Sequence, residues 1–280
     1  MATDYQLKQA SFLTKHGKER VVLPLLKESL GLEVQHVDSF DTDQFGTFTR
    51  DVERKGNQLE AAIAKARKGM EIAGTKIGIA SEGLFTTDPY AGMFPWNNEI
   101  VVLVDDEIDI VVVGMASSHA QSYSALVDDL ADLESHLNKA NFPSHHLVVR
   151  PESESNPKFV KGISTLEELH AAFISAKNIS LNGKVFIEND LRAFANPTRM
   201  QNIVSATINL TEKIKSTCPQ CGFPGFWLTK LNAGLICSGC KSLTKQAKSK
   251  TYSCLKCGHE EIRGVKKAFA DPGECNYCNP

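Results

Sequence analysis

Apolar residues recur at helical spacing from residue 59 to residue 70 and then give way to a short apolar run. The recurring positions are Leu59, Ile63, Ala66 and Met70. They predict a helix with one buried face, and Gly74 suits its end because glycine readily adopts the left-handed cap conformation. Residues 77–80 predict a short buried strand. We interpret Ser81-Glu82-Gly83 as an acidic turn at the carboxyl end of that strand, where open α/β sheets bind ligands.

Similar patterning predicts an α/β domain with a mixed sheet over residues 1–216. Residues 11–37 predict a strand, a turn at 14–18, a helix and a second strand, the usual opening of such a domain. Thr165 with Glu168 forms a capping box, and Pro197 suits the first turn of a helix. The other predicted elements are helices at 122–140, 165–177 and 197–216, strands at 99–104, 108–115, 145–150 and 184–187, and polar loops at 41–56, 86–98 and 151–157.

The cysteines change this picture, because all eight lie beyond residue 217. They form four C-x-x-C pairs: Cys218 and Cys221, Cys237 and Cys240, Cys254 and Cys257, and Cys275 and Cys278. Two such pairs supply the four thiolates of a tetrahedral zinc site, and four thiolates close it to substrate. We therefore expect two structural zinc ions in a tandem zinc-ribbon tail over residues 217–280. Sequential pairing is preferred because its loops are short, and interleaved pairing remains the alternative.

Composition and charge limit the function. The chain has 280 residues with 42% hydrophobic and 23% charged residues and a net charge of -2, which excludes a strongly basic protein. The tail holds nine Lys/Arg and four Asp/Glu, a local charge of +5. No apolar run predicts a membrane span, and no secretion signal is recognised at the amino terminus. Together with the thiolate spacing, this favours the cytoplasm.

Two segments resemble the inosine/xanthosine triphosphate pyrophosphatase family. Gly17-Lys18 match the G-K that ends the family's first turn, with Lys15 in place of its Asn. Residues 60–67, EAAIAKAR, match the family's E-N-A-x-x-K-A-R helix except at the Asn, and Glu82-Gly83 fit the E-G-G turn of a related branch. The whole chain, with KHGKE, FPWN, NPTRM and the cysteine-rich tail, also resembles a group of uncharacterised bacterial proteins.

The resemblance implies a Mg²⁺-dependent phosphohydrolase or pyrophosphatase acting on a nucleotide or related phosphorylated compound. Glu60, Glu82 and Lys18 are then the candidate catalytic residues, with the two carboxylates holding Mg²⁺. The candidate phosphate-binding residues are Lys15, Gly17, Lys18, Gly83 and Arg67, and Arg50 is a further candidate for stabilising charge. A turn at a helix start suits phosphate because its N–H groups are free.

Other interpretations remain open. A glutamate at a position such as Glu60 is more often a solvated helix carboxylate than a ligand, and Arg192 and Arg199 near a helix start could reach an anion. The alternative function is a non-catalytic zinc-ribbon protein that binds nucleic acid or a protein partner. Its tail would use lysines with three aromatic residues, Phe223, Phe226 and Trp227, although those rings also suit the small core of a ribbon. The oligomeric state is not predicted.

Overall fold

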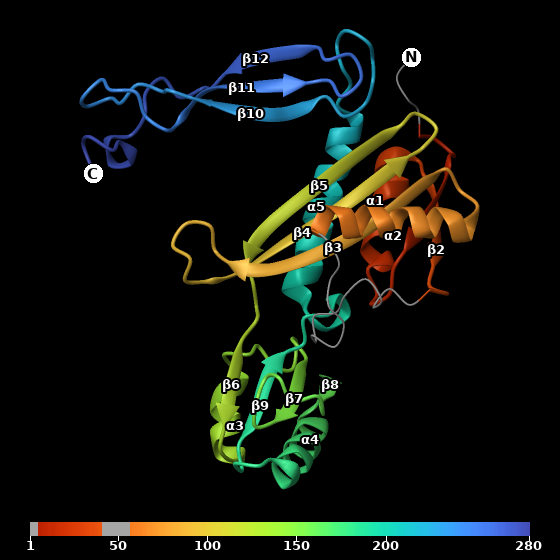
Figure 1. The fold of residues 1–280 in the computed structure, drawn as a ribbon, viewed down its shortest axis with the longest axis vertical. Helices are drawn as coiled ribbons and strands as arrows, with labels where there is room; N and C mark the ends of the chain where they lie inside the picture. Colours follow the sequence, from red (N-terminus) through yellow and green to blue (C-terminus); the bar gives the residue numbers. More distant parts are fainter. Residues whose placement is uncertain (1–4, 41–56) are drawn as a thin grey trace. The chain divides into compact units, whose positions relative to one another are not determined.

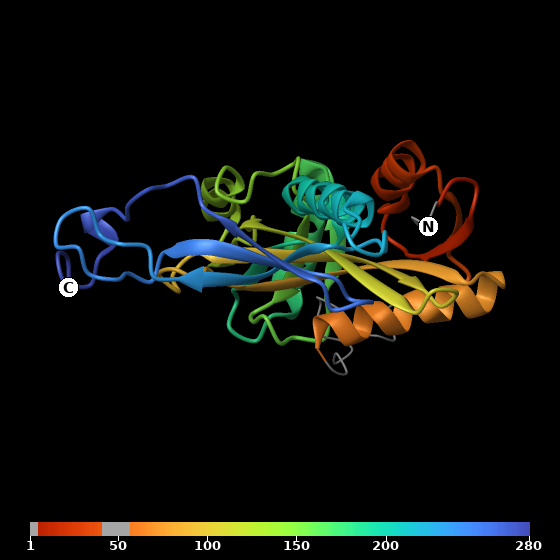
Figure 2. The same cartoon turned by 90° about the horizontal axis from the view of Figure 1, so that it is seen from above.

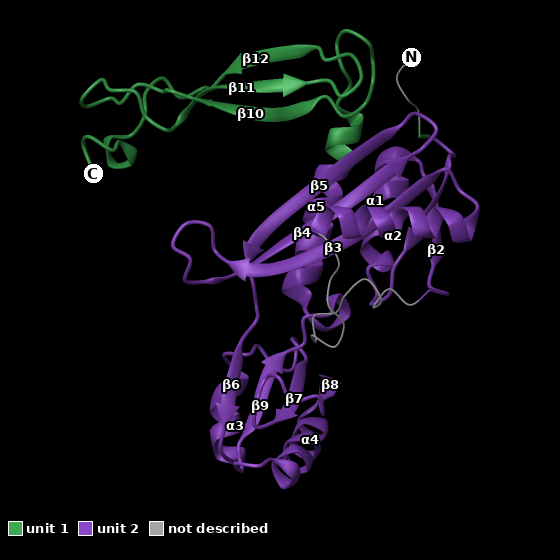
Figure 3. Ribbon diagram, viewed as in Figure 1, with its two compact units in different colours: residues 1–5, 211–280 green, residues 6–210 purple. Residues whose placement is uncertain are grey.

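The computed structural model describes residues 5–40 and 57–280, and the predicted loop at 41–56, with Arg50, lies outside the described residues. Contacts divide the chain into two compact units: unit 1 comprises residues 1–5 and 211–280, and unit 2 comprises residues 6–210 (Figure 3). Helix α5 (Pro197–Lys215) begins in unit 2 and ends in unit 1. Each unit is described separately below.

Unit 2 begins with the predicted strand, helix and strand, which are β1 (Gln9–Leu13), α1 (Glu19–Leu30) and β2 (Glu33–Val37). Helix α2 (Gln58–Ala73) follows the undescribed segment, and β3 (Ile77–Thr87), β4 (Pro95–Asp105) and β5 (Ile110–His119) complete a five-stranded sheet. The strand order is β2-β1-β3-β4-β5 (Figure 1). Strands β1, β2 and β3 are parallel, and β4 and β5 are antiparallel to their neighbours, which confirms a mixed sheet.

Helices cover both faces of this sheet (Figure 2). Helix α2 packs on one face, where Gly78 lets the strand approach Ala66 and Met70 closely: a Cβ at Gly78 would lie 2.6 Å from the carbonyl oxygen of Ala66. Helix α5 packs on the other face, where a Cβ at Gly114 would lie 2.1 Å from the carbonyl oxygen of Ala206. Both faces are therefore buried, which explains the continuous apolar run of the central strands.

A second sheet in unit 2 has the order β6-β9-β7-β8, from β6 (Ser124–Val127), β7 (Leu147–Pro151), β8 (Val160–Ile163) and β9 (Val185–Asn189), and is antiparallel throughout. Helices α3 (Leu130–Leu137) and α4 (Leu166–Ile179) share its apolar core. The capping box predicted at Thr165 is present. A short 3-10 helix, η2 (Ala193–Ala195), leads to α5, which starts at Pro197 as predicted.

Two predicted elements of unit 2 differ from the structure, and one strand was missed. The helix predicted at 122–140 is a strand and a shorter helix, because residues 124–127 pair with β9 and Asp129 caps α3 at its start. The loop predicted at 86–98 is confined to 88–94, because its two ends extend β3 and β4, and strand β8 was not predicted. Each error reflects strand pairing, which local periodicity does not reveal.

Unit 1 contains a three-stranded antiparallel sheet of β10 (Trp227–Ala233), β11 (Ala247–Ser253) and β12 (Glu260–Gly264), with a short 3-10 helix, η3 (Pro272–Glu274), near its end. Phe223 and Phe226 are buried, so these two rings belong to the small core of the unit, as the alternative interpretation held. Among the described residues, no helix has both the length and the apolar character that crossing a membrane requires.

Candidate functional site

The turn between β1 and α1 presents the start of a helix without a side-chain cap. His16 and Gly17 have positive φ angles of 70° and 75°, and helix α1 then begins after Lys18. Among residues 5–40 and 57–280, no side chain caps the first turn of this helix. Amide N–H groups at an uncapped helix start form a favourable site for an anion. Gly17 and Lys18, both predicted phosphate-binding residues, therefore lie where a phosphate would be held.

Lys18 is a buried lysine whose side-chain hydrogen bonds, within the described part of the chain, go to one uncharged residue. Its Nζ lies 3.0 Å from Oγ and 3.4 Å from the carbonyl oxygen of Ser81, and 6% of the residue is exposed. No carboxylate of the described residues lies within ion-pair distance of this ammonium. Burial, followed by the charge of Arg199, lowers the pKa of Lys18 to about 7. A buried cation in this state favours a ligand anion, which would supply the missing charge partner.

Glu82 lies in the middle of a strand, and the prediction of a turn at residues 81–83 is wrong. Strand β3 continues to Thr87 because its second half pairs with β4, from Glu82 opposite Ile100 to Thr87 opposite Pro95. Glu82 is buried and forms an ion pair with Lys65 of helix α2. Lys65 was part of the matched helix motif but was not among the predicted site residues.

The neighbours of Glu82 in sequence belong to the opposite face of the sheet, because successive side chains of a strand alternate between faces. Gly83 contacts a buried ion pair between Glu99 of β4 and Arg199 of α5. In this pair, Arg199 Nε lies 2.7 Å from Glu99 Oε1. Asn97 donates to Glu99 Oε1 at 3.0 Å, and Asn202 donates to Asn97 Oδ1 at 2.8 Å. The second carboxylate oxygen of Glu99, Oε2, is buried without a hydrogen-bond partner among the described residues.

The structure thus brings together a charged group that the sequence only partly indicated. Three cations and two carboxylates lie around β3 near the end of β1, with the Lys65–Glu82 pair on the α2 face of the sheet and the others on the opposite face. Four of these side chains influence the pKa of Lys18. Its members are Lys18, Lys65, Glu82, Glu99 and Arg199. Arg199 was predicted as a possible anion contact. Glu99 was not predicted as a site residue. Its place at the start of the apolar run 99–104 was nevertheless a sequence signal for a buried charge that needs a partner.

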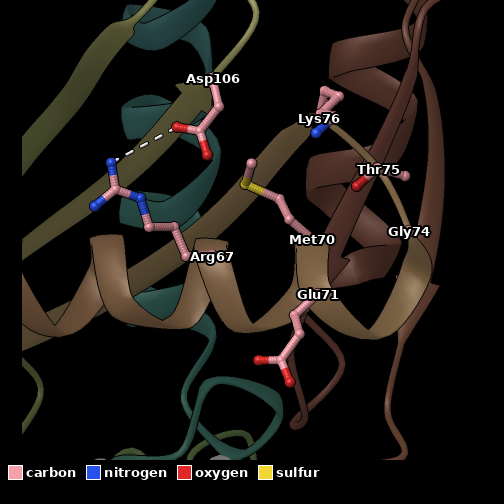
Figure 4. A pocket seen from close by; sticks show the side chains of 7 residues that line it. All are labelled: Arg67, Met70, Glu71, Gly74, Thr75, Lys76 and Asp106. Atoms are coloured by element: carbon pink, nitrogen blue, oxygen red, sulfur yellow. Dashed lines mark ion pairs between the residues drawn. The ribbon is translucent and has the colours of Figure 1, made fainter.

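The remaining predicted residues have other contacts. Glu60 is the third residue of α2 and completes a capping box with Asn57, accepting from its amide at 3.0 Å. Arg67 lies in a separate pocket of about 360 Å³ near the other end of α2, 3.6 Å from Asp106 (Figure 4). Asp106 follows Asp105, which pairs with Ile77 at the start of β3. Ile77 is five residues before Glu82, so Arg67 lies at a different part of the strand and is not part of the charged group. Lys15 lies in the turn before α1 and is half-buried.

The Mg²⁺ prediction receives no support from this geometry. Glu60 is occupied as a helix cap, and Glu82 is occupied by the ammonium of Lys65. Among the described residues, the groups of three or more side chains able to hold a metal are the two cysteine clusters. The donor set around β3 is therefore predominantly cationic and suits an anion better than a metal ion.

The cysteines of unit 1 form two clusters of four, and the sequential pairing is wrong. The first cluster contains Cys218, Cys221, Cys254 and Cys257, and the second contains Cys237, Cys240, Cys275 and Cys278. Strand β10 carries the chain from one cluster to the other, and β11 returns it antiparallel, so the first and third pairs meet at one end of the sheet. The unit is thus a single interleaved module with two sites.

The sulfur geometry fits zinc. Closest Sγ atoms of different pairs are 3.6–3.7 Å apart, and all eight thiols are free of disulfides. A tetrahedral site with Zn–S bonds of about 2.3 Å has sulfurs about 3.8 Å apart. Hydrogen bonds from Ser242 lower the pKa of Cys240 to about 6, which favours the thiolate that binds metal. These eight residues would hold two zinc ions, and four-thiolate sites supply folding energy rather than a reaction.

Three of the four pairs share one backbone turn. The residue after the second cysteine has a positive φ, at Gly222 (70°), Lys241 (64°) and Gly258 (70°), and its amide donates to the carbonyl of the first cysteine. Glycine at two of these positions follows from that conformation. The glycines were therefore a correct sequence signal for metal-binding turns.

Comparison with protein families places the chain in a family. The family described as Domain of unknown function (DUF6671) matches residues 65–280, well over half of the chain. The chain belongs to this family. The matched region contains all eight cysteines together with Lys65, Glu82, Glu99 and Arg199, and it begins after Lys18. No match was found among curated proteins.

Proposed function

We propose that unit 2 is a phosphohydrolase that acts on a nucleotide or related phosphorylated compound, and that the zinc-binding tail is structural. The observation that carries this proposal is Lys18, a buried ammonium with no carboxylate partner among the described residues, at the uncapped start of α1. A phosphate placed there accepts hydrogen bonds from backbone amides and neutralises the ammonium. Its binding raises the pKa of Lys18 back toward the ordinary value of 10.5.

The neighbouring charges suit the hydrolysis of a phosphoanhydride bond. Arg199 adds positive charge on the same face of the sheet as Lys18, which stabilises the negative charge that grows on phosphate oxygens during transfer. Glu82 and Lys65 lie on the opposite face, so Glu99, whose Oε2 has no hydrogen-bond partner among the described residues, is the candidate for orienting the attacking water. No step is assigned to Mg²⁺, because Glu60 and Glu82 are both occupied by other contacts.

The test is release of phosphate and pyrophosphate from standard and deaminated nucleoside triphosphates by the zinc-loaded full chain, with and without Mg²⁺. The variants are Lys18→Met and Glu99→Gln, each checked for folding by circular dichroism, with Lys76→Met as the control because Lys76 lies in the separate pocket at the end of α2. The proposal expects turnover that both site variants lose and the control keeps. No release from any triphosphate, by protein with two bound zinc ions, would overturn it.

A second candidate function is nucleic-acid binding by unit 1. Lys250 of β11 lies between Leu231 of β10 and Arg263 of β12, and the guanidinium of Arg263 lies 4.3 Å from the ring centroid of Tyr252. This places cations beside an aromatic ring, as single-stranded nucleic acid requires. Binding of an oligonucleotide by the full chain, weakened by salt and by a Lys250→Glu and Arg263→Glu double variant, would support it. Binding that is indifferent to salt would exclude it.

A further inference from the structure

An apolar groove lies beside the first turns of α5. It has a volume of about 430 Å³ and is lined by Ala193, Phe194, Pro197, Met200, Gln201 and Val204. The last four residues recur every three or four positions, so they share one side of the helix. The side of α5 that carries Arg199 and Asn202 instead faces the buried network on the sheet. The groove is therefore separate from the contacts that hold α5 in place.

Phe194 joins this groove to the turn before α1. Its Cβ lies 3.6 Å from the position that a Cβ on Gly17 would occupy, and its ring stacks on His16 with centroids 6.0 Å apart. The guanidinium of Arg192 lies 4.7 Å from the same ring. His146 contacts the ring edge-on, and its Nδ1 is buried without a hydrogen-bond partner among the described residues. An aromatic ring and a ring nitrogen without a hydrogen-bond partner among the described residues thus border the place proposed for phosphate, together with a guanidinium that is itself ion-paired with Asp190.

We propose that this α5 groove receives the base of a nucleoside phosphate whose phosphates lie at the turn formed by residues 15–18. The assignment rests on the proposed function and adds the part of the substrate that gives it specificity. A base is flat and apolar on its faces, and it stacks on aromatic rings. Its edge carries hydrogen-bonding groups, and the amide of Gln201 offers both a donor and an acceptor at the groove. The substrate class is accordingly a nucleoside polyphosphate rather than inorganic polyphosphate or a sugar phosphate.

The test compares ligands with and without a base. Dissociation constants of ATP, GTP, ITP and inorganic tripolyphosphate are measured by calorimetry on the zinc-loaded full chain. The groove variants are Phe194→Ala and Val204→Glu. Ser175→Glu is the control, because it adds the same charge to an exposed position of helix α4, whose residues do not line the groove. Circular dichroism and zinc content establish that each variant is folded.

The groove variants are expected to weaken the best nucleotide about tenfold or more, as the loss of base stacking implies, and to leave tripolyphosphate unchanged. Ser175→Glu is expected to change the binding of neither ligand, and Lys18→Met is expected to weaken the binding of both. Equal losses for both ligands in the groove variants, or no loss, would overturn the base assignment and leave the proposed function standing. Failure of wild type to bind any of the four ligands would overturn the proposed function and this assignment with it. A Val204→Glu change that alters only the oligomeric state would mark the groove as a contact between copies and also overturn the assignment.

Discussion

Replacing Gly83 by alanine should disrupt the buried ion pair that joins α5 to the sheet. An added Cβ would lie 2.2 Å from Glu99 Oε1 and 2.6 Å from Arg199 Nη2, well inside van der Waals contact. Both side chains must move by about 1 Å, and both are almost completely buried, with exposed fractions of 0% and 2%. Overpacking of a core costs about 1–3 kcal/mol, and breaking a buried ion pair costs about 3–5 kcal/mol. Because the pair shifts rather than disappears, we expect a loss of about 2–4 kcal/mol in the free energy of unfolding.

The assay is urea denaturation followed by tryptophan fluorescence. The chain has two tryptophans, Trp96 in unit 2 and Trp227 in unit 1, so a Trp227→Phe background reports on unit 2 alone. Thr87→Ala is the control, since Thr87 is exposed at the end of the same strand β3 and so lies in the unit that the assay reports on. We expect no more than a few tenths of a kcal/mol from that control.

A double-mutant cycle separates this explanation from a general effect of the substitution. In a Glu99→Ala background the carboxylate no longer lies above Gly83, so Gly83→Ala should cost at least 1 kcal/mol less than in the native background. Equal costs in the two backgrounds would refute the reasoning, as would a Gly83→Ala protein that unfolds at the wild-type urea concentration.

Three further predictions concern metal, pH and the helix cap. Serine substitution of the first and third cysteine pairs together should leave one bound zinc ion, measured by mass spectrometry. Substitution of the first and second pairs should abolish both sites. The reverse result would show that the pairs are sequential. Because the pKa of Lys18 is about 7 in the folded protein and near 10.5 when unfolded, the unfolded chain binds more protons between these values. Wild type should therefore gain up to about 1.4 kcal/mol per pH unit relative to Lys18→Met between pH 7 and 10, and a flat difference would contradict the burial of this ammonium. Glu60→Gln should preserve both thermal stability and any turnover, because glutamine also serves in a capping box. A large loss of turnover without a loss of stability would instead support a role for Glu60 as a metal ligand.

Local signals account for the elements that were predicted correctly. The helix α2, its capping residue at Gly74 and the β1–α1–β2 opening follow from apolar spacing and from glycine at a left-handed cap. The capping box at Thr165 depends on residues three positions apart. These features were predictable because the atoms that decide them are close in sequence.

The candidate site was predicted only in part. Gly17 and Lys18 were found because a glycine-lysine turn at a helix start has a local meaning for phosphate. Glu82 was identified as a site residue but placed in a turn, since nothing local shows that residues 82–87 pair with 95–100. The partnership of Glu99 with Arg199 joins residues one hundred positions apart, and no spacing rule links them.

The cysteines show most clearly the difference between what local sequence predicts and what long-range strand pairing decides. Their number and C-x-x-C spacing were enough to identify eight metal ligands and two sites, because each pair is a turn of four residues that carries its own chemistry. Which pairs share an ion depends on the antiparallel course of β10 and β11, which returns the third pair to the first and overrides the preference for short loops. Residue chemistry and close spacing therefore established what the chain contains, whereas strand pairing over long sequence separations established which of those groups meet.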